Sequence, residues 1–308
     1  MDLQTRPADS KTIGAVVVSY QSAAVLEPCL SALERAAPRR GVTIRVVDNA
    51  STDSSVAIAT ARLGAGAVIA RPANRGFGAG VNAGLAALDT PYVAVLNPDV
   101  RIPAGALDAL AERMDTLPRT GLLAPRVVGD DGRIEHTVGR FPTVARERAH
   151  ALGLDRLPGI EGRRAALPTG CVPVDWVSGC AWLLRREAVR EVGPLDEDYF
   201  MYYEDVDFCR RLHDAGWGVM ACPEPLVIHT IGRGSSATSA VPADGGVAPL
   251  RYFEKFADPA AQRAARRWLR LGWTLRLAWR AGRVALGHAA SRREATRYRL
   301  ALDRTAHA

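Results

Sequence analysis

The stretch Ile13–Ser19 reads IGAVVVS, a continuous apolar run that is rich in β-branched residues. Such a run is typical of a central parallel strand buried on both faces of a sheet. Three similar runs and four segments with helical spacing follow it, namely Thr43–Val47, Ala67–Ala70, Tyr92–Leu96, Val25–Ala36, Ser54–Leu63, Gly76–Leu88 and Pro103–Met114. This alternation predicts an α/β fold, with a mostly parallel sheet and helices on both of its faces.

The second half of the chain shows a different pattern. The turn sequence Gly129–Gly132 (GDDG) lies between two apolar runs, which is typical of a hairpin. Trp176–Leu184 predicts a strand with a break at Ser178-Gly179, and Phe141–Pro168 shows no clean periodicity. We therefore expect one large domain over residues 11–250, whose two halves cover about 11–120 and about 121–250, followed by a helical tail over 251–308.

The positive charge of the chain is concentrated in this tail. The whole chain of 308 residues has a formal charge of +7. Residues 259–308 hold twelve arginines and two acids, a charge of +10, which leaves −3 for the rest. A local basic segment of this kind favours an anionic partner for the tail.

Three absences in the sequence bear on the compartment. The cysteines have no paired spacing, which predicts free thiols in a reducing cytosol; they are Cys29, Cys171, Cys180, Cys209 and Cys222. The N-terminal residues MDLQTRPADSK lack an apolar segment, so we expect no signal peptide. No uncharged apolar run reaches about 18 residues, so we expect no membrane-spanning helix.

The stretch Pro194–Gly216 contains seven carboxylates, and four aromatic residues precede a predicted helix that ends near Gly216. Glu204 and Asp205 fall at the start of that helix, where free amides and the helix dipole favour a carboxylate. Asp205 can be an ordinary helix N-cap. It can equally be a general base, because a helix start holds a carboxylate at a fixed position.

Polar residues also stand at the ends of three predicted strands. Ligands of parallel sheets bind beyond the carboxyl ends of the strands, where Ser19, Asp48 and Asp99 lie. Asp48 can bind a nucleoside or form an Asx turn, and Asp99 can bind Mg²⁺ or serve a turn. His229 ends a later apolar strand and is either a second metal ligand or a structural residue.

A glycine-rich segment, Asn74–Gly80 (NRGFGAG), opens the predicted helix Gly76–Leu88. Its glycines allow the close approach of a ligand or backbone, and Arg75 can contact a phosphate. The pattern is GxGxG, and it lacks the lysine of a P-loop, so by itself it is a weak nucleotide motif.

Five segments in this order resemble glycosyltransferase family 2, and most of all its bacterial rhamnosyltransferase-like branch. They are VVVSYQSAAVLEPCLSAL, VVDNASTDSS, NRGFGAGVNAGL, VAVLNPDV and GPLDEDYFMYYEDVDFCRRLHDAGW. The resemblance covers roughly residues 13–235. It implies a GT-A fold, a nucleotide-sugar donor, a divalent metal (Mg²⁺ or Mn²⁺) and inversion at the anomeric carbon.

The resemblance also assigns roles to single residues. Asp205 takes the place of the catalytic base, with Glu204 beside it. Asp99 and His229 take the places of metal ligands, although the first carboxylate of the DxD motif is replaced by Asn97. The nucleotide-sugar site would contain Ser19, Tyr20, Asp48, Asn49, Asn74, Arg75, Gly76, Asn82 and Asn97. The acceptor site would contain Trp176, Ser178, Gly179 and Asp198.

The reaction expected from this resemblance is transfer of L-rhamnose from dTDP-L-rhamnose to a hydroxyl of a polyprenyl-diphosphate-linked N-acetylglucosamine, in cell-wall or polysaccharide assembly. UDP-galactofuranose and UDP-hexoses remain alternative donors. Two other functions are a nucleotidyltransferase that makes a nucleotide-sugar and a non-catalytic membrane-associated scaffold. A nucleotidyltransferase favours a glycine-rich basic loop after the first strand, and residues 19–22 (SYQS) do not provide one.

The tail segment Arg263–Gly287 predicts an amphipathic helix. One apolar stripe contains Trp268, Leu271, Leu275, Trp279, Gly282 and Leu286. Arginine with interfacial tryptophan is the composition of helices that lie on an anionic membrane, so we expect a peripheral protein on the cytoplasmic face of the cell membrane. Leu269, Trp273 and Leu277 form a second apolar side, which leaves packing on the catalytic domain or in a homodimer as the alternative. No reading motif for nucleic acid accompanies the arginines.

Overall fold

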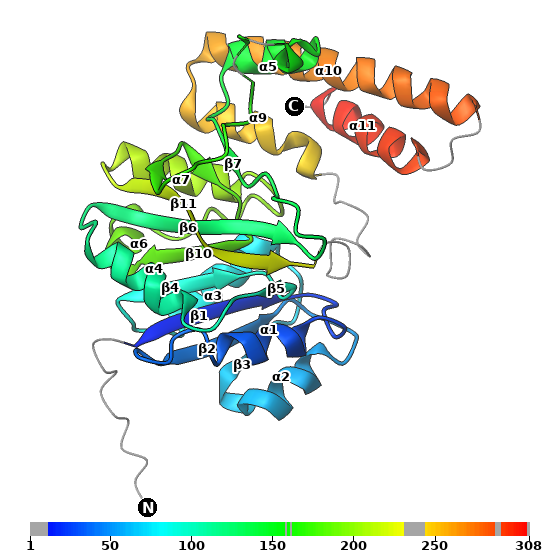
Figure 1. Ribbon diagram of the computed structural model, residues 1–308. Coiled ribbons are helices and arrows are strands. Elements are labelled where there is room, and N and C mark those ends of the chain that lie inside the picture. Colours follow the sequence, from blue (N-terminus) through cyan, green and yellow to red (C-terminus); the bar gives the residue numbers. More distant parts are fainter. Residues whose placement is uncertain (1–11, 158, 161, 231–243, 287–290, 307–308) are drawn as a thin grey trace, which may run out of the picture. The chain divides into compact units, whose positions relative to one another are not determined.

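The structure is a computed structural model, and it describes residues 12–157, 159–160, 162–230, 244–286 and 291–306. The chain forms two compact units that interleave along the sequence (Figure 1). The first unit takes Met1–Val138, Leu167–Glu197 and Glu204–Ser239, and the second takes Gly139–Ala166, Asp198–Tyr203 and Ala240–Ala308. The segment 1–11, for which we predicted no signal peptide, lies outside the described residues.

The first unit contains one large sheet. Its strands are β1 (Ile13–Ser19), β2 (Val42–Asp48), β3 (Val68–Ala70), β4 (Tyr92–Leu96), β5 (Val100–Arg101), β6 (Thr120–Gly129), β8 (Val172–Pro173), β10 (Ala181–Arg185) and β11 (Gly218–His229). Among the described residues the order is β3-β2-β1-β4-β10-β6-β11-β5, and β8 also pairs with β11. The pairs among β1–β4 and the pair β6–β11 are parallel, whereas β10, β5 and β8 pair antiparallel with their neighbours. The sheet is therefore mixed and mostly parallel, as predicted.

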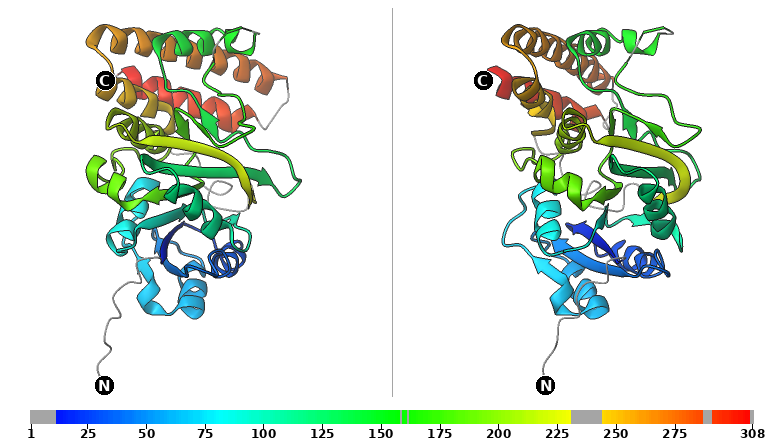
Figure 2. Two further views of the ribbon diagram at one scale, coloured as in Figure 1. Left: turned by 60° about the vertical axis from the view of Figure 1, so that its left-hand side comes forward. Right: turned by 90° about the vertical axis from the view of Figure 1, so that its left-hand side faces the viewer.

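Helices cover both faces of this sheet (Figure 2). They are α1 (Leu26–Leu33), α2 (Ser55–Leu63), η1 (Ala65–Ala67), α3 (Phe77–Ala86), α4 (Ala106–Asp115), α6 (Arg186–Val192) and α7 (Glu204–Asp214). Strand β1 shows how the two faces arise. Its residues Ile13, Ala15 and Val17 belong to the core that includes α1 and α4. Val16 and Val18 point the other way and meet α3, which confirms the predicted burial of β1 on both faces.

The predicted break inside Trp176–Leu184 is confirmed. Strand β9 (Trp176–Val177) ends before Ser178, and β10 begins at Ala181. Strand β9 pairs in a separate two-stranded sheet with β7 (Val138–Gly139), at whose second residue the chain passes into the second unit. Ser178 and Gly179 therefore take no part in the strand pairing of the large sheet and can approach other segments.

The second unit is helical. It contains α5 (Val144–Ala151), η2 (Leu154–Arg156), α9 (Asp244–Phe256), α10 (Pro259–Ala285) and α11 (Ser291–Ala306). Leu269 and Trp273 of α10 are buried in a small core with Leu250, Phe253 and Ala301. The pattern Phe141–Pro168 did not predict α5, because the buried face of that helix holds alanines and Glu147 in place of large apolar residues. No helix in the described ranges is long and apolar enough to cross a membrane.

The prediction that all five cysteines are free thiols was wrong for one pair. Cys171 and Cys222 form a disulfide, with their Cα atoms 3.9 Å apart. Val172 of β8 lies opposite Ala221 of β11 in an antiparallel pair. Cys171, just before Val172, therefore faces Cys222, just after Ala221. Sequence spacing does not reveal this register. The other three cysteines are buried free thiols, and burial raises the pKa of each.

Candidate active site

The carboxyl ends of β1 and β2 lie side by side, because Ser19 is paired with Asp48 in the parallel register. Both are buried, and the Ser19 hydroxyl has no hydrogen-bond partner in the part of the chain that the structure describes. Asp48 accepts hydrogen bonds from the Ser51 amide (2.8 Å) and hydroxyl (2.6 Å). This is the Asx turn considered as one alternative for Asp48, and it is formed with neutral donors only.

The loops that follow these two strands are joined by hydrogen bonds. The amide of Gln21 donates to Ser51 Oγ (2.8 Å), and the amide of Tyr20 donates to Ser22 Oγ (3.2 Å). Gln21 and Ala50 have left-handed φ values of 52° and 63°. Left-handed residues with a Cβ are strained, and they occur most often at binding and catalytic sites. The predicted nucleoside-binding edge is therefore a rigid and locally strained surface.

The glycine-rich segment is held to β2 by side-chain amides. Asn49 Nδ2 donates to the Gly76 carbonyl (3.0 Å), and Asn74 Oδ1 accepts from the Gly76 amide (2.9 Å). Gly76 has a φ of 90°, which requires glycine. Gly80 and Gly84 serve packing, because a Cβ at either position would overlap Val18 or Val16 of β1. The close approach predicted for these glycines is thus between α3 and the sheet.

The start of α3 also meets the acidic stretch. Asn82 donates to the Leu195 carbonyl and accepts from the Leu195 amide, both at 2.9 Å. Its amide also lies 3.1 Å from Glu197, which pairs with Arg75 at 3.6 Å. Sequence reasoning placed Asn82 and Arg75 in the donor site. The structure shows that they attach the acidic stretch to the glycine-rich helix.

Asp205 lies at the start of α7 with its carboxylate held by backbone amides. Its oxygens accept from the Val206 amide (2.8 Å) and from the Gly179 amide (3.3 Å). A Cβ on Gly179 would lie 3.0 Å from Phe77 of α3, so glycine is needed for this approach. The structure therefore brings the predicted base together with the predicted acceptor residue Gly179. Ser178 is fixed beside it, since its amide donates to the Thr137 carbonyl (2.8 Å).

Glu204 is more deeply buried than Asp205. It is buried, and its Oε2 meets no hydrogen-bond donor from the described residues. Burial first, and the neighbouring Asp205 carboxylate second, raise the pKa of Glu204 well above its usual value. Such a shift favours the protonated form of Glu204, and an acid of this kind beside a second carboxylate is common in acid–base sites.

The residues just before this pair belong to the second unit. Tyr202 and Tyr203 have left-handed φ values of 70° and 72°. Tyr203 packs edge-on against Tyr252 of α9. Asp198, predicted to bind the acceptor, pairs with Arg251 of α9. Trp176 is half-buried in β9 of the first unit.

Asp99 and His229 are adjacent, as predicted for a metal pair. Strand β5 pairs His229 with Val100, and His229 Nε2 lies 3.2 Å from Asp99 Oδ1. Asp99 is 6% exposed, and among the described residues only the His229 imidazole approaches this oxygen. A buried carboxylate oxygen and an imidazole nitrogen are suitable ligands for Mg²⁺ or Mn²⁺. No group of three or more His, Cys, Asp or Glu able to hold a metal occurs in the described ranges. A bound cation would therefore also need oxygen ligands from a bound nucleotide-sugar.

Glu135 is a third member of this cluster, and sequence reasoning missed it. Its carboxylate oxygens lie 2.9 and 3.2 Å from His229 Nδ1. Burial lowers the pKa of His229, but the contacts with Asp99 and Glu135 outweigh it and raise the pKa to about 9. The GDDG turn was the available signal, because the hairpin it predicts returns the chain to the end of β6. An antiparallel bridge between Val128 and Ile134 confirms that hairpin.

The base and the metal pair are connected through one short segment. Gly179 contacts Asp205, and the carbonyl of the next residue, Cys180, accepts from the Asn97 amide (2.9 Å). Asn97 begins the turn that carries Asp99 into β5. The predicted donor, base and metal residues of the first unit therefore share one edge of the sheet, beyond the carboxyl ends of β1, β2 and β4.

Comparisons with known proteins show the family and the fold of the chain. The model of the family described as Glycosyl transferase family 2 matches residues 15–193. An N-acetylglucosaminyl-diphospho-decaprenol L-rhamnosyltransferase of Mycobacterium tuberculosis (strain ATCC 25618 / H37Rv) is 35% identical over 229 residues, which span 70% of this chain and 74% of that protein.

Two solved structures show the same fold at low sequence identity. The mannosyltransferase PcManGT from Pyrobaculum calidifontis, in complex with GDP-Man and Mn²⁺, has a TM-score of 0.55 at 15% identity, covering 94% of this chain and 84% of its own. GalNAc-T7 with UDP, GalNAc and Mn²⁺ has a TM-score of 0.59 at 14% identity, covering 79% of this chain and 47% of its own. These neighbours confirm the predicted GT-A-like fold class.

Proposed function

The chain belongs to glycosyltransferase family 2, and we propose that it is an inverting rhamnosyltransferase that uses dTDP-L-rhamnose as its donor. Its acceptor in this proposal is a hydroxyl of a polyprenyl-diphosphate-linked N-acetylglucosamine. The similarity to a rhamnosyltransferase over 70% of the chain supports this choice of donor and acceptor. The assembled product would be part of a cell wall or polysaccharide.

The observation that carries the proposal is the arrangement of Asp205. Its carboxylate is fixed by the Gly179 and Val206 amides, next to Glu204, whose pKa is raised by burial and by the Asp205 carboxylate, so that its protonated form is favoured. A positioned carboxylate of this kind can take the proton of an attacking hydroxyl, which contributes roughly 10²–10⁴-fold to the rate. Acids that serve only as helix caps do not need a protonated acid beside them.

The reaction proceeds by direct displacement. The acceptor oxygen forms a bond to the anomeric carbon while the bond from that carbon to the donor's phosphate oxygen breaks. The acceptor's proton goes to Asp205, and the electron pair of the broken bond leaves with the nucleoside diphosphate. The carbon is attacked on the face opposite the leaving group, so its configuration inverts.

The leaving diphosphate needs positive charge. Asp99 and His229 would hold a Mg²⁺ or Mn²⁺ ion, with Asn97 at the start of the same turn. The cation would neutralise charge that develops on the diphosphate oxygens. Arg75 is exposed at the start of α3 and can exchange its weak contact with Glu197 for a phosphate. The nucleoside would bind beside Ser19, Tyr20, Asp48 and Asn49.

The second unit supports peripheral binding to an anionic membrane. The two apolar sides predicted for the tail helix differ in burial in α10. Leu269 and Trp273 are buried within the second unit. Leu275 and Trp279 are 47% and 55% exposed and follow Leu271 along one stripe. Arg280 and Arg283 lie 4.6 and 5.3 Å from the Trp279 ring. The exposed stripe is thus rimmed with positive charge, as in helices that lie on membranes.

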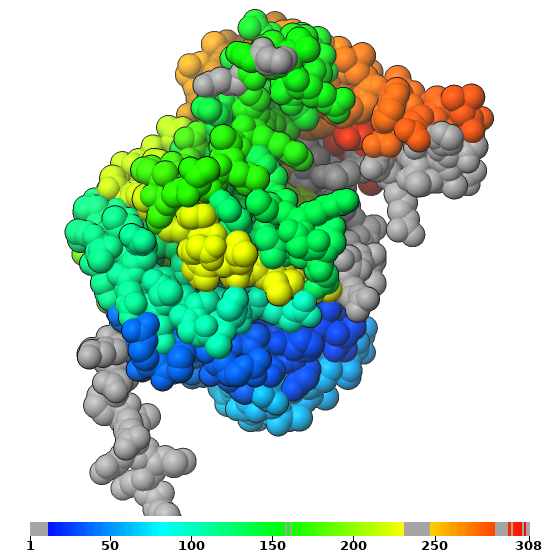
Figure 3. Space-filling view, in the orientation of Figure 1, coloured from blue at the N-terminus to red at the C-terminus, as the bar shows by residue number. Residues whose placement is uncertain are grey.

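Arginines also line a hollow on the same helix. Arg263, Arg266, Arg267 and Arg270 surround a volume of about 420 Å³. The outer surface of α10 is visible in the space-filling view (orange in Figure 3). Each basic residue near an anionic leaflet contributes about 1 kcal/mol to binding.

Vesicles with anionic lipid should therefore bind the full chain, and the double variant Leu275→Ser/Trp279→Ser should bind at least about tenfold more weakly. The matched variant Thr274→Ser/Ala278→Ser should bind like the wild type; equal binding by both pairs would contradict this role of the stripe.

The enzymatic proposal is tested by nucleoside diphosphate release from a panel of donors, with and without polyprenyl-diphosphate N-acetylglucosamine. We expect release from dTDP-L-rhamnose that depends on the acceptor, and little from UDP-galactofuranose or UDP-glucose. Release from another donor would change the assigned sugar. Formation of a nucleotide-sugar from a nucleoside triphosphate would instead identify a nucleotidyltransferase, and inactivity with every donor and acceptor pair would support the scaffold function.

A further inference from the structure

Glu135 stands out because it contacts the proposed metal pair without being part of it. A carboxylate can only accept hydrogen bonds, so His229 Nδ1 must donate to Glu135 across the 2.9 Å contact. When a cation displaces one proton from His229, the imidazole that keeps its other proton on Nδ1 has its lone pair on Nε2. Nε2 is the nitrogen that lies 3.2 Å from Asp99 Oδ1. The contact with Glu135 therefore selects the nitrogen that can bind a cation beside Asp99.

Glu135 is itself held in place by the backbone. Its amide donates to the Val127 carbonyl (2.9 Å), on the strand that pairs with β11. The turn of its hairpin is fixed by Asp130, which contacts Arg101 of β5 at 2.6 Å and Thr230 at 3.3 Å. Glu135 and His229 are both mostly buried. The carboxylate therefore approaches the imidazole from an anchored hairpin that is tied to β5, β6 and the end of β11.

We propose that Glu135 is a positioning residue for His229, which it orients through Nδ1 so that Nε2 and the Asp99 carboxylate bind one divalent cation together. This inference rests on the proposed function, since it assigns a role within the same site. Carboxylates that orient metal-bound histidines usually change metal affinity 10–100-fold when they are removed. Glu135 would have no contact with the sugar or the nucleoside.

Two substitutions separate the hydrogen bond from the charge. Glu135→Gln and Glu135→Ala remove the same negative charge, but only glutamine keeps an oxygen that can accept from Nδ1. Glu112→Ala is the matched control, because Glu112 is an exposed glutamate of the first unit that pairs with Arg39. His229→Ala reports the loss of the imidazole itself.

The experiment measures Mn²⁺ binding to the full-length protein by electron paramagnetic resonance, in the presence of dTDP and, separately, of UDP. We expect Glu135→Ala to bind Mn²⁺ about 10–100-fold more weakly and Glu135→Gln to keep most of the affinity. Pulsed measurements should show coupling of Mn²⁺ to an imidazole nitrogen in the wild type and in Glu135→Gln, and a weakened coupling in Glu135→Ala. Glu112→Ala should match the wild type.

Three results would overturn the inference. One is wild-type Mn²⁺ affinity in Glu135→Ala while His229→Ala is impaired. Another is equal impairment of Glu135→Gln and Glu135→Ala, which would assign the effect to charge alone. The third is wild-type affinity in His229→Ala, which removes the metal role of the histidine. None of these results decides whether the enzyme transfers a sugar, because donor turnover by the wild type is measured without reference to Glu135.

Discussion

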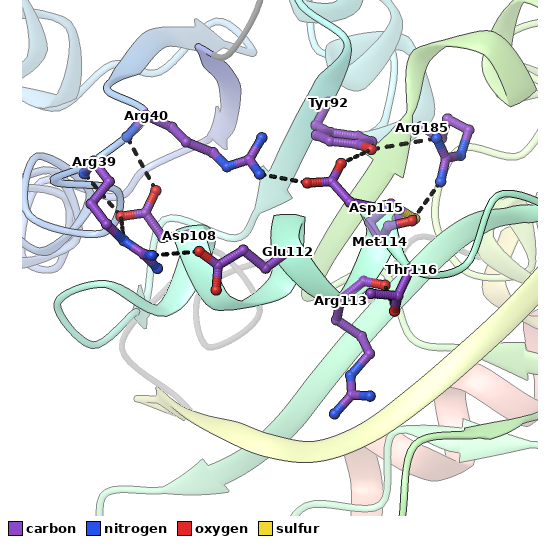
Figure 4. Close-up of polar contacts among 10 residues, drawn as sticks. All are labelled: Arg39, Arg40, Tyr92, Asp108, Glu112, Arg113, Met114, Asp115, Thr116 and Arg185. Atoms are coloured by element: carbon purple, nitrogen blue, oxygen red, sulfur yellow. Dashed lines mark hydrogen bonds and ion pairs between the residues drawn. The ribbon is translucent and has the colours of Figure 1, made fainter.

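The acidic side chains near the two ends of β4 have different partners. At the amino end, acids are matched with cations: Arg39 contacts Glu112 at 2.5 Å, Arg40 contacts Asp115 at 2.5 Å, and the Tyr92 hydroxyl donates to Asp115 (Figure 4). At the carboxyl end, Asp99 meets only an imidazole among its described contacts. Nearby, Asp48 is held by the neutral donors of Ser51. Both ends are rich in polar groups, but the acids of the amino end meet arginines, whereas Asp99 meets an imidazole, whose charge depends on pH.

This difference separates acids that stabilise the fold from acids that await a ligand. Asp108 at the amino end is buried and accepts from the backbone amides of Arg39 and Arg40. Arg185 adds bonds to the carbonyls of Met114 and Leu117 at the end of α4. A buried acid without such partners costs stability, and it persists where a substrate or metal supplies the missing contact. Substitutions at the two ends should therefore affect different measurable quantities.

The largest effect is expected for Asp99→Ala at the carboxyl end. Because the cation bridges the protein and the diphosphate, the variant should lose donor affinity and turnover together, by at least about 10²-fold in turnover. The unfolding midpoint should stay near that of the wild type. Calorimetric titration with dTDP and Mn²⁺ measures the binding. Full activity of the wild-type enzyme in excess chelator would contradict a role for the metal. Charge neutralisation would then be assigned to Arg75 and backbone amides.

The reverse pattern is expected for Asp108→Asn at the amino end. An amide presents one oxygen to the two backbone amides, so one buried donor loses its partner, which costs roughly 1–3 kcal/mol of unfolding free energy. Turnover per folded molecule should not change, since this end has no part in the reaction. Urea denaturation followed by circular dichroism gives the stability. An unchanged unfolding free energy together with reduced turnover in Asp108→Asn would contradict the proposed distinction between the two ends.

The sequence predicted much of the first unit, and the reasons are local. Strand β4 and helix α2 lie where the apolar runs and helical spacing placed them, and the break at Ser178-Gly179 separates β9 from β10. The Cys171–Cys222 disulfide was not predictable, because it depends on the register of strands that are distant in sequence. For Glu135, the GDDG turn indicated the return toward the end of β6 but not the contact with His229. Helix α5 was missed because its buried face is built from small and charged residues. The adjacency of Asp99 and His229 was expected from the resemblance alone.

The smallest effect concerns pH and the metal-free protein. The pKa of His229 is raised from 6.5 to about 9, so its contribution to stability is complete below pH 6.5 and is lost as the pH rises through about 9. The shift corresponds to at most about 3 kcal/mol, and with solvent screening we expect roughly 1 kcal/mol. Denaturation of the wild type in chelator should therefore show falling stability between pH 6.5 and 9. His229→Gln should remove that part of the pH dependence; an identical slope in the variant would show that His229 does not carry it.

The most direct test of the account is a comparison of Asp205→Asn with Asp214→Asn. Both acids lie on α7, but Asp205 faces Gly179 at the start of the helix, and Asp214 pairs with the exposed side chain of Arg210 at its end. We predict that Asp205→Asn lowers transfer from dTDP-L-rhamnose at least about 10²-fold while dTDP binding is kept, because asparagine preserves the shape but cannot take the acceptor's proton. Asp214→Asn should transfer at nearly the wild-type rate. Wild-type transfer by Asp205→Asn would contradict the central claim that this carboxylate is the base.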